Sequence, residues 1–269
     1  MSARGLGLKY RFVFTLTAGR TGTEWLRRLL ADNLGIPAIH EPLEIDDFGT
    51  RMPDIRLMRS FNDRGNTSLV QDFHAGKFAG LKHQRAYAET NHTLGKCGLV
   101  ENLLALGLGG ETCLILLKRD LFAQCLSYLV RRDFTNATIV WQWYLHYAYR
   151  NIIVDTAPFM FLDDLGQAVW YAHEMQARLI YYESLFGSQV KMLGCSLEQL
   201  NTPQGAGALL SALGHSGAVR LPPPANRNVL EDEARFAERL RHGLGALDVD
   251  IAAMVRSYIA SGRRLDAVR

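Results

Sequence analysis

The sequence predicts an α/β fold, in which helices flank a central parallel sheet on both faces. Two short apolar runs, at residues 10–16 and 112–117, are rich in β-branched or other large apolar residues, and each passes through a polar turn into a helical pattern. Strands that alternate with helices in this way are typical of βαβ units, which build parallel sheets. With 269 residues, of which 48% are apolar, the chain is long enough to bury a full core.

The first unit starts with the strand at residues 10–16, which ends at a glycine turn. Residues 24–30 follow with apolar side chains on one face at helical spacing, and this predicts an amphipathic helix. Gly35 is suited to end that helix, because glycine readily takes the left-handed conformation of a C-cap. A short extended piece with two prolines then covers residues 36–42.

The remaining elements continue this alternation. Residues 45–78 are polar and irregular, and we expect loop and weak helix there, as part of a substrate-facing cover. The elements predicted after them are a strand at 85–90, helices at 100–106 and 121–131 on either side of the strand at 112–117, a helix at 165–177, a strand at 178–182 and a charged helix at 231–241. We expect a single domain over residues 1–269, with a core at about 8–190 and a helical C-terminal part at about 191–269.

Composition narrows the class of protein. The formal net charge of +3, from 30 basic and 27 acidic residues, does not favour a nucleic acid partner but suits a pocket for a small polyanion. The four cysteines show no paired spacing and predict buried free thiols in a reducing compartment. No signal-peptide pattern and no apolar stretch of membrane-spanning length occur, so we expect a cytoplasmic protein without a membrane span.

The turn after the first strand predicts a phosphate site. A strand that feeds a tight glycine turn into a helix directs free backbone N–H groups and the positive end of the helix dipole at one point. Gly22 allows close approach of an anion, Thr21 and Thr23 offer hydroxyl donors, and Arg20 adds a forked cation. The turn is not a Walker A loop, because no Lys-Ser or Lys-Thr follows the glycine. A plain strand–helix turn with a surface arginine is the alternative.

A second pair of residues supports a phosphate site. Arg119 follows the strand at 112–117, and Ser127 lies eight residues later in the next predicted helix. Both side chains can reach one phosphate at the carboxyl edge of the sheet, where open α/β sheets bind ligands. An ordinary ion pair of Arg119 with Asp120 or another neighbour is the alternative.

Together these motifs resemble those of the sulfotransferases that use 3′-phosphoadenosine 5′-phosphosulfate (PAPS). The segment 20–25 is similar to the family's 5′-phosphosulfate loop, with Arg20 for the usual lysine, Thr21 for the usual serine and Trp25 at the family's tryptophan. The segment 119–127 looks like the 3′-phosphate motif, and 182–185 (Tyr-Glu-Ser-Leu) is similar to the family's Tyr-Glu-Asp-Leu. The resemblance covers about residues 10 to 190. The family's late Arg-Lys-Gly element is absent, and Arg227 is a candidate substitute.

The resemblance implies a P-loop-like three-layer fold and transfer of a sulfuryl group from PAPS to a hydroxyl or amine of a small-molecule or carbohydrate acceptor. It implies in-line transfer with a general base and without a metal, with Arg20 at the sulfuryl oxygens and Trp25 near the adenine. The cosubstrate-binding set that follows is Gly19, Arg20, Thr21, Gly22, Thr23, Glu24, Trp25, Arg119, Ser127 and Arg227.

Two residues are candidates for the base. Glu41 lies just past the first helix, where similar carbohydrate sulfotransferases carry a catalytic glutamate, and His40 beside it can tune its pKa or share the work. His92 follows the strand at 85–90 and resembles the catalytic histidine of small-molecule sulfotransferases. A structural turn at Glu41 and a structural histidine at position 92 are the alternatives.

Two other functions compete with this one. A P-loop nucleotide kinase would need a lysine in the loop and carboxylates for Mg²⁺, for which Asp120 is the candidate. A non-catalytic nucleotide-binding protein would keep the fold without a working base. Activity in EDTA is expected of a sulfotransferase and not of a kinase.

Overall fold

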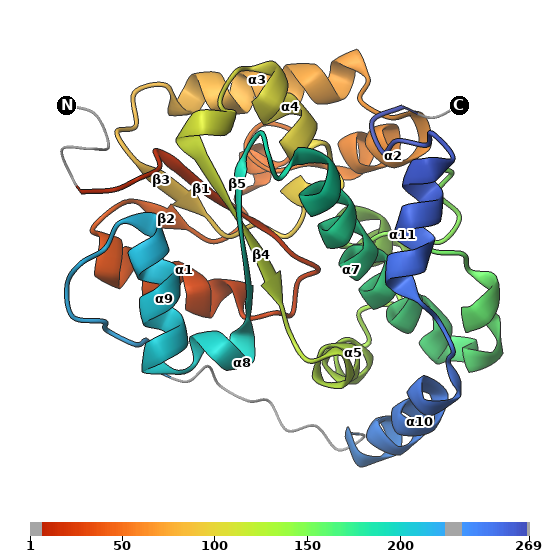
Figure 1. The fold of residues 1–269 in the computed structure, drawn as a ribbon. Helices are drawn as coiled ribbons and strands as arrows, with labels where there is room; N and C mark the ends of the chain where they lie inside the picture. The colour runs from red at the N-terminus through yellow and green to blue at the C-terminus, as the bar shows by residue number, and fades with distance from the viewer. Residues whose placement is uncertain (1–6, 224–232, 268–269) are drawn as a thin grey trace.

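The structure is a computed structural model that describes residues 7–223 and 233–267. In these residues five strands form one sheet in the order β2-β3-β1-β4-β5. The strands are β1 (Phe12–Leu16), β2 (Ala38–Ile39), β3 (Tyr87–Glu89), β4 (Thr112–Lys118) and β5 (Lys191–Ser196). All of their pairings are parallel, so the carboxyl ends of the strands meet at one edge of the sheet (Figure 1).

Helices cover both faces of the sheet. Those of the described residues are α1 (Thr23–Leu34), α2 (Ile55–Arg64), α3 (Ser68–Leu81), α4 (Leu99–Ala105), α5 (Leu121–Val130), α6 (Ala137–Trp143), α7 (Gly166–Phe186), α8 (Leu197–Leu200), α9 (Pro203–Leu213), α10 (Glu233–Ala246) and α11 (Ile251–Ala260). Short 3₁₀ helices are η2 (Ile45–Asp47), η3 (Leu94–Lys96), η4 (Gly109–Glu111) and η5 (Ala157–Leu165). None of these helices is both long and apolar enough to cross a membrane.

Alternation along the strands separates two cores. In β1, Phe12, Phe14 and Leu16 point into the larger core, which α2, α3, α4, α5 and α7 cover, whereas Val13 points into the core under α1 and α9. Figure 1 shows α1 and α9 together on one side of the sheet and α3, α4 and α7 on the other. The predicted P-loop-like three-layer fold, with a parallel sheet between helices, is therefore confirmed.

The expectation of loop and weak helix at residues 45–78 was wrong over most of its length. Helix α2 and most of α3 occupy this segment. In α2 the buried apolar residues Leu57, Met58 and Phe61 share one face, and the side chain of Asp54 caps the helix by accepting from the N–H of Leu57. The charged residues between them lie on the other sides of the helix, so the segment does have a helical period, but its overall polarity favours a loop prediction.

The strand predicted at 178–182 is also wrong, because these residues continue helix α7, and the strand β5 was not predicted. Helix α7 is buried on most sides, so its aromatic and branched residues show no helical period. Strand β5 lies at the sheet edge, contains Gly194 and is half exposed, and each of these features weakens a strand signal. The predicted C-terminal helix is α10, and residues 231 and 232 of that prediction lie outside the described part.

The four cysteines are free, as predicted. Cys97, Cys113 and Cys125 are buried and Cys195 is half buried. Burial raises the pKa of Cys113, Cys125 and Cys195 to about 12, so these thiols stay protonated near neutral pH.

Candidate functional site

The predicted phosphate loop, residues 17–22, connects the carboxyl end of β1 to the start of α1. Strand β1 is the central strand, with β3 and β4 on either side. The segments that leave β3 and β4 therefore flank the loop, and the segment that leaves β2 comes next along the sheet edge. This order brings residues 40, 92 and 119 to the same edge as the loop.

Three residues of the loop adopt left-handed backbone conformations, namely Gly19 (φ 82°), Arg20 (φ 56°) and Gly22 (φ 86°). This conformation is natural for glycine and unusual for arginine. The two glycines also make close contacts. A Cβ at Gly22 would lie 2.5 Å from a methyl carbon of Leu197, and one at Gly19 would lie 3.0 Å from the ring of His92. The loop thus packs against the segments that follow β5 and β3.

The backbone N–H groups of the loop are free to bind a ligand. The first helical hydrogen bond of α1 runs from Leu26 N–H to Gly22 O, at 2.9 Å. Gly22 is the N-cap residue and has no side chain that could accept from the N–H groups between Gly22 and Leu26. Within residues 7–223 and 233–267 no acceptor bonds the N–H groups of residues 19–25. Unpaired N–H groups at a helix N-terminus attract an anion.

The carbonyl groups of the loop, in contrast, are bound by the protein. The hydroxyl of Tyr171 donates to Ala18 O, and the hydroxyl of Tyr128 donates to Gly19 O at 3.0 Å. Arg119 donates from a terminal nitrogen to Arg20 O at 2.9 Å. Three consecutive carbonyl oxygens are therefore held by donors from α7, α5 and the end of β4.

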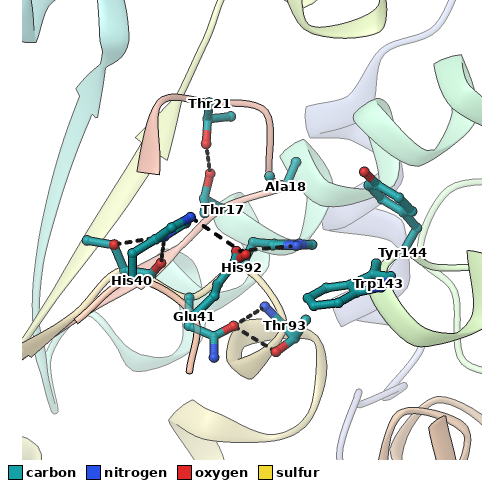
Figure 2. Close-up of polar contacts among 12 residues, drawn as sticks. Thr17, Ala18, Thr21, His40, Glu41, His92, Thr93, Trp143 and Tyr144 are labelled. Atoms are coloured by element: carbon teal, nitrogen blue, oxygen red, sulfur yellow. Dashed lines mark hydrogen bonds and ion pairs between the residues drawn. The ribbon is translucent and has the colours of Figure 1, made fainter. Parts of the chain in front are cut away.

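Thr17 and Thr21 brace the loop from inside (Figure 2). Thr17 Oγ1 donates to Leu117 O at 2.8 Å and lies 2.6 Å from Thr21 Oγ1. Because a threonine hydroxyl has one proton, Thr17 accepts from Thr21 in this arrangement. The hydroxyl proton of Thr21, which was expected to serve a phosphate, is used within the loop here.

Arg20, Arg119 and Ser127 lie together, although the last two are about 100 residues from Arg20 in the chain. Arg20 Nε donates to Ser127 Oγ at 3.1 Å, and Arg119 holds the carbonyl of Arg20. Burial and the charge of Arg20 lower the pKa of Arg119, and the guanidinium groups together form a positive site beside the free N–H groups.

Glu41 follows β2 and lies between two histidines (Figure 2). Its Oε1 is 3.4 Å from Nε2 of His92, and its Oε2 is 3.7 Å from Nε2 of His40. His40 is held through Nδ1, which lies 2.9 Å from Thr90 O. Burial raises the pKa of the Glu41 carboxyl, and the charges of His40, Lys96 and Arg20 oppose this rise. A carboxyl with a raised pKa close to a cationic anion site has the properties of a general base.

His92 is buried against the loop and against two aromatic rings. Its ring stacks on Trp143 with centroids 5.9 Å apart and lies 5.9 Å from the ring of Tyr144, on the side away from Glu41 (Figure 2). Nδ1 of His92 is 2.7 Å from Nζ of Lys96. Burial, followed by the charges of Lys96, His40 and Arg20, lowers the pKa of His92 well below its usual value. His92 is therefore neutral near pH 7.

The remaining predicted residues have different surroundings. Glu24 bonds to Arg27 and Arg28 on its own helix, and the hydrogen bond from Arg27 lowers its pKa to about 2. Trp25 is only 6% exposed and packs in the core under α1 and α9, so stacking on adenine stays a prediction for it. Thr23 is buried at the first position of α1. Arg227 lies outside the described residues.

Lys96, Trp143 and Tyr144 are part of this arrangement but were not predicted as site residues. The signal available for Lys96 is its position four residues after His92, in a polar stretch between a strand and a helix. Tyr144 is a core residue and Trp143 packs against the core, and both are also neighbours of His92.

A cavity of about 590 Å³ lies between α5, η5, α7 and α10. The ring of Tyr128 lines it, and the hydroxyl of the same residue holds Gly19 O. Neither Glu41 nor His92 lines the cavity, because Phe134 and Tyr144, whose ring centroids are 4.7 Å apart, lie between. The cavity therefore adjoins the loop through Tyr128 and is separate from the group of side chains around Glu41.

Comparisons with known proteins add a distant likeness. No family model and no curated protein matches the sequence. Among solved structures, the chain is similar to a sulfotransferase from Alicyclobacillus acidocaldarius, with 17% sequence identity over 91% of this chain and 98% of that chain and a TM-score of 0.44. A likeness this distant does not define an activity, which has to be inferred from the geometry of the site.

Proposed function

We propose that the protein is a sulfotransferase that transfers the sulfuryl group of PAPS to a hydroxyl or amine of a small-molecule or carbohydrate acceptor. The observation that carries the proposal is that two devices are joined through His92. The loop with free N–H groups, Arg20, Arg119 and Ser127 packs at Gly19 against the ring of His92. His92 Nε2 in turn lies 3.4 Å from the buried carboxyl of Glu41, whose pKa is raised. The first device suits the phosphates of the cosubstrate, and the second suits removal of a proton from the acceptor.

Different parts of the site are suited to different groups of PAPS. The free N–H groups of residues 19–24 suit the 5′-phosphate, and Arg119 with Ser127 suits the 3′-phosphate. Arg20 has terminal guanidinium nitrogens without a protein acceptor in the described residues, so it is suited to the sulfuryl and bridging oxygens.

The transfer step then needs one base and one cationic group. Glu41 takes the proton of the acceptor hydroxyl while the acceptor oxygen forms a bond to sulfur. The bond from sulfur to the bridging phosphate oxygen breaks, and 3′-phosphoadenosine 5′-phosphate leaves with the electron pair. Arg20 neutralises the negative charge that develops on the leaving oxygen, as cationic groups do in phosphoryl transfer.

Calorimetric titration with 3′-phosphoadenosine 5′-phosphate in EDTA, beside ATP with Mg²⁺, tests the nucleotide part of the proposal. We expect metal-independent binding of the bisphosphate. Arg119→Ala is expected to weaken it roughly 10- to 100-fold, because a charged hydrogen bond contributes about 1.5–3 kcal/mol. Lys118→Ala is the matched control, since it removes an exposed cation from the last position of β4, directly before Arg119.

The control variant should bind the bisphosphate as the wild type does. Binding of ATP with Mg²⁺ together with indifference to the bisphosphate would contradict the sulfotransferase proposal and favour a P-loop kinase. Equal losses in Arg119→Ala and Lys118→Ala would mean that Arg119 acts only through overall charge.

A further inference from the structure

Lys96 is a fully buried lysine, with an exposed fraction of 0%, at the end of η3 just after β3. Lysine is rarely found in such a place, because taking an ammonium group out of water is costly unless it finds partners. The partners here are polar atoms from three different segments. Nζ lies 2.7 Å from Nδ1 of His92 and 3.0 Å from the hydroxyl oxygen of Tyr171. It also donates to the carbonyl oxygen of Trp143.

With Lys96 as an ammonium group, counting protons assigns the roles in this group. The hydroxyl of Tyr171 donates its proton to Ala18 O, so it accepts from Lys96. The carbonyl of Trp143 can only accept. An ammonium group has three donors and no acceptor, and its third donor therefore goes to His92 Nδ1. With Nδ1 as an acceptor, the proton of the neutral imidazole is on Nε2, which faces Glu41 at 3.4 Å.

A neutral Lys96 would reverse this order, because its lone pair would accept from His92 Nδ1–H and leave Nε2 without a proton. Burial lowers the pKa of Lys96 well below its usual value, the negative charge of Glu41 opposes that shift, and the charge of Arg178 adds to it. The faces of Tyr144 and Tyr171, with centroids 5.6 Å and 5.3 Å from Nζ, also favour the cation. A neutral His92 between ammonium and carboxylate balances the charge of the group.

We propose that Lys96 is a positioning residue that keeps His92 in the tautomer protonated at Nε2, so that His92 donates to Glu41 and the role of base falls to Glu41. The catalytic part of this inference rests on the proposed sulfotransferase function, whereas the tautomer does not. Without the ammonium group, the imidazole is free to take either tautomer. In the tautomer protonated at Nδ1, the lone pair on Nε2 faces the carboxylate and repels it from its position.

Nitrogen NMR of the wild-type protein labelled with ¹⁵N-histidine tests the tautomer directly. The signal of His92, one of eight histidines, is assigned by its disappearance in His92→Gln. We expect Nδ1 to be unprotonated and Nε2 protonated near neutral pH. In Lys96→Met we expect a mixture of tautomers or the Nδ1-protonated form. A wild-type His92 protonated at Nδ1, or an unchanged pattern in Lys96→Met, would overturn the proposal.

Kinetics of the same variant separates a positioning role from a purely structural one. The probe is bisphosphate release from PAPS with a panel of mono- and disaccharides. Lys96→Met is expected to lower kcat roughly 10-fold or more, as loss of base positioning does, with bisphosphate affinity and KM for PAPS unchanged. Lys191→Met, which removes an exposed lysine from β5, is the control and should retain the wild-type kcat.

The outcomes distinguish this inference from the proposed function. If the wild-type protein shows the expected tautomer but does not bind the bisphosphate, the sulfotransferase proposal fails and the assignment of His92 stands. If the bisphosphate binds and Lys96→Met keeps both the wild-type tautomer and kcat, the role of Lys96 is contradicted and the sulfotransferase proposal stands. If Lys96→Met does not fold, the wild-type spectrum still decides the tautomer.

Discussion

Glu41 and His92 are neighbours, but burial acts on their charges in opposite directions. Burial disfavours the charged form of each group, so it raises the pKa of Glu41 and lowers the pKa of His92. A base must be unprotonated to work. If Glu41 is the base, the rate falls as pH decreases through a pKa above the ordinary value of about 4.3 for glutamate. If His92 were the base, the rate would fall only well below pH 6.5.

Two glutamine substitutions separate these possibilities. Glu41→Gln is expected to lower kcat/KM roughly 100- to 10,000-fold at pH values above the pKa of Glu41 and to remove the acid limb of the profile, because a general base contributes about that much. His92→Gln keeps an N–H donor near the position of Nε2, so it is expected to retain most of the activity and the acid limb of the profile. The measurement is the pH dependence of bisphosphate release from PAPS with saccharide acceptors. A large loss in His92→Gln together with a small loss in Glu41→Gln would reverse the assignment.

Single residues differ in how far the sequence reveals them. Arg119 and Ser127 are recognisable because they follow a strong strand signal, and the order of elements in an α/β sheet brings such positions to one edge. Their contacts with Arg20 agree with that reasoning. The spacing of Lys96 from His92 does not reveal its burial, because that depends on Tyr171 and Trp143, which are 75 and 47 residues away in the chain.

At the scale of the element, the phosphate loop depends on backbone conformations that a side chain would disturb. Gly22→Ala places a Cβ 2.5 Å from a methyl carbon of Leu197, at a φ of 86°. The left-handed conformation alone costs a non-glycine residue about 1–2 kcal/mol. The loop of this variant is expected to relax out of the left-handed conformation, which binding must then restore, so bisphosphate affinity should fall roughly 10-fold. Calorimetry measures the affinity, and thermal unfolding measures whether the fold persists.

Gly80→Ala serves as the control for that substitution. Gly80 lies in α3, and a Cβ there would have nothing within 4 Å. Alanine is the better helix former, so this variant should bind normally and be more stable by about 0.5–1 kcal/mol. Normal binding by Gly22→Ala together with unchanged thermal unfolding would show that the left-handed conformation at this position is dispensable.

Among the elements, those with a local signal were predictable. Strands β1 and β4 are buried on both faces and read as continuous apolar runs. Residues 178–182 are just as apolar, but Arg178 pairs with Glu174 one helical turn earlier, and this contact belongs to a helix. The type of a short apolar segment is decided by such partners and by its packing, neither of which is apparent in its composition.

At the scale of the whole molecule, the ion pair of Arg178 and Glu174 joins α7 to the segment that follows α6. Both side chains are 0% exposed. Arg178 Nε donates to Glu174 Oε1 at 2.8 Å, and Glu174 Oε2 accepts from the N–H groups of Ile153 and Val154, at 2.9 Å each. A terminal nitrogen of Arg178 also donates to Asn151 O at 3.0 Å. This group of hydrogen bonds holds residues 151–154, which follow Trp143 and Tyr144 in the chain.

Removing one member of this pair should be costly. Arg178→Met leaves a buried carboxylate without its counter-charge, so the free energy of unfolding is expected to fall by about 3–5 kcal/mol. Arg239→Met is the control, because it breaks an ion pair with Asp164 at the surface and should cost less than about 1 kcal/mol. Urea denaturation measures both variants. Equal losses would mean that the buried pair contributes no more than a surface pair.

The three bound carbonyls of the phosphate loop determine how its peptide planes are turned. Helix α7, helix α5 and the end of β4 each hold one of the oxygens of Ala18, Gly19 and Arg20. The lone pairs of these peptides therefore face protein donors rather than a ligand. On the other side, the backbone of the loop presents only amide protons to a ligand. Preference for an anion is thus built into the orientation of the backbone itself, and it persists at any pH at which the surrounding helices stay folded.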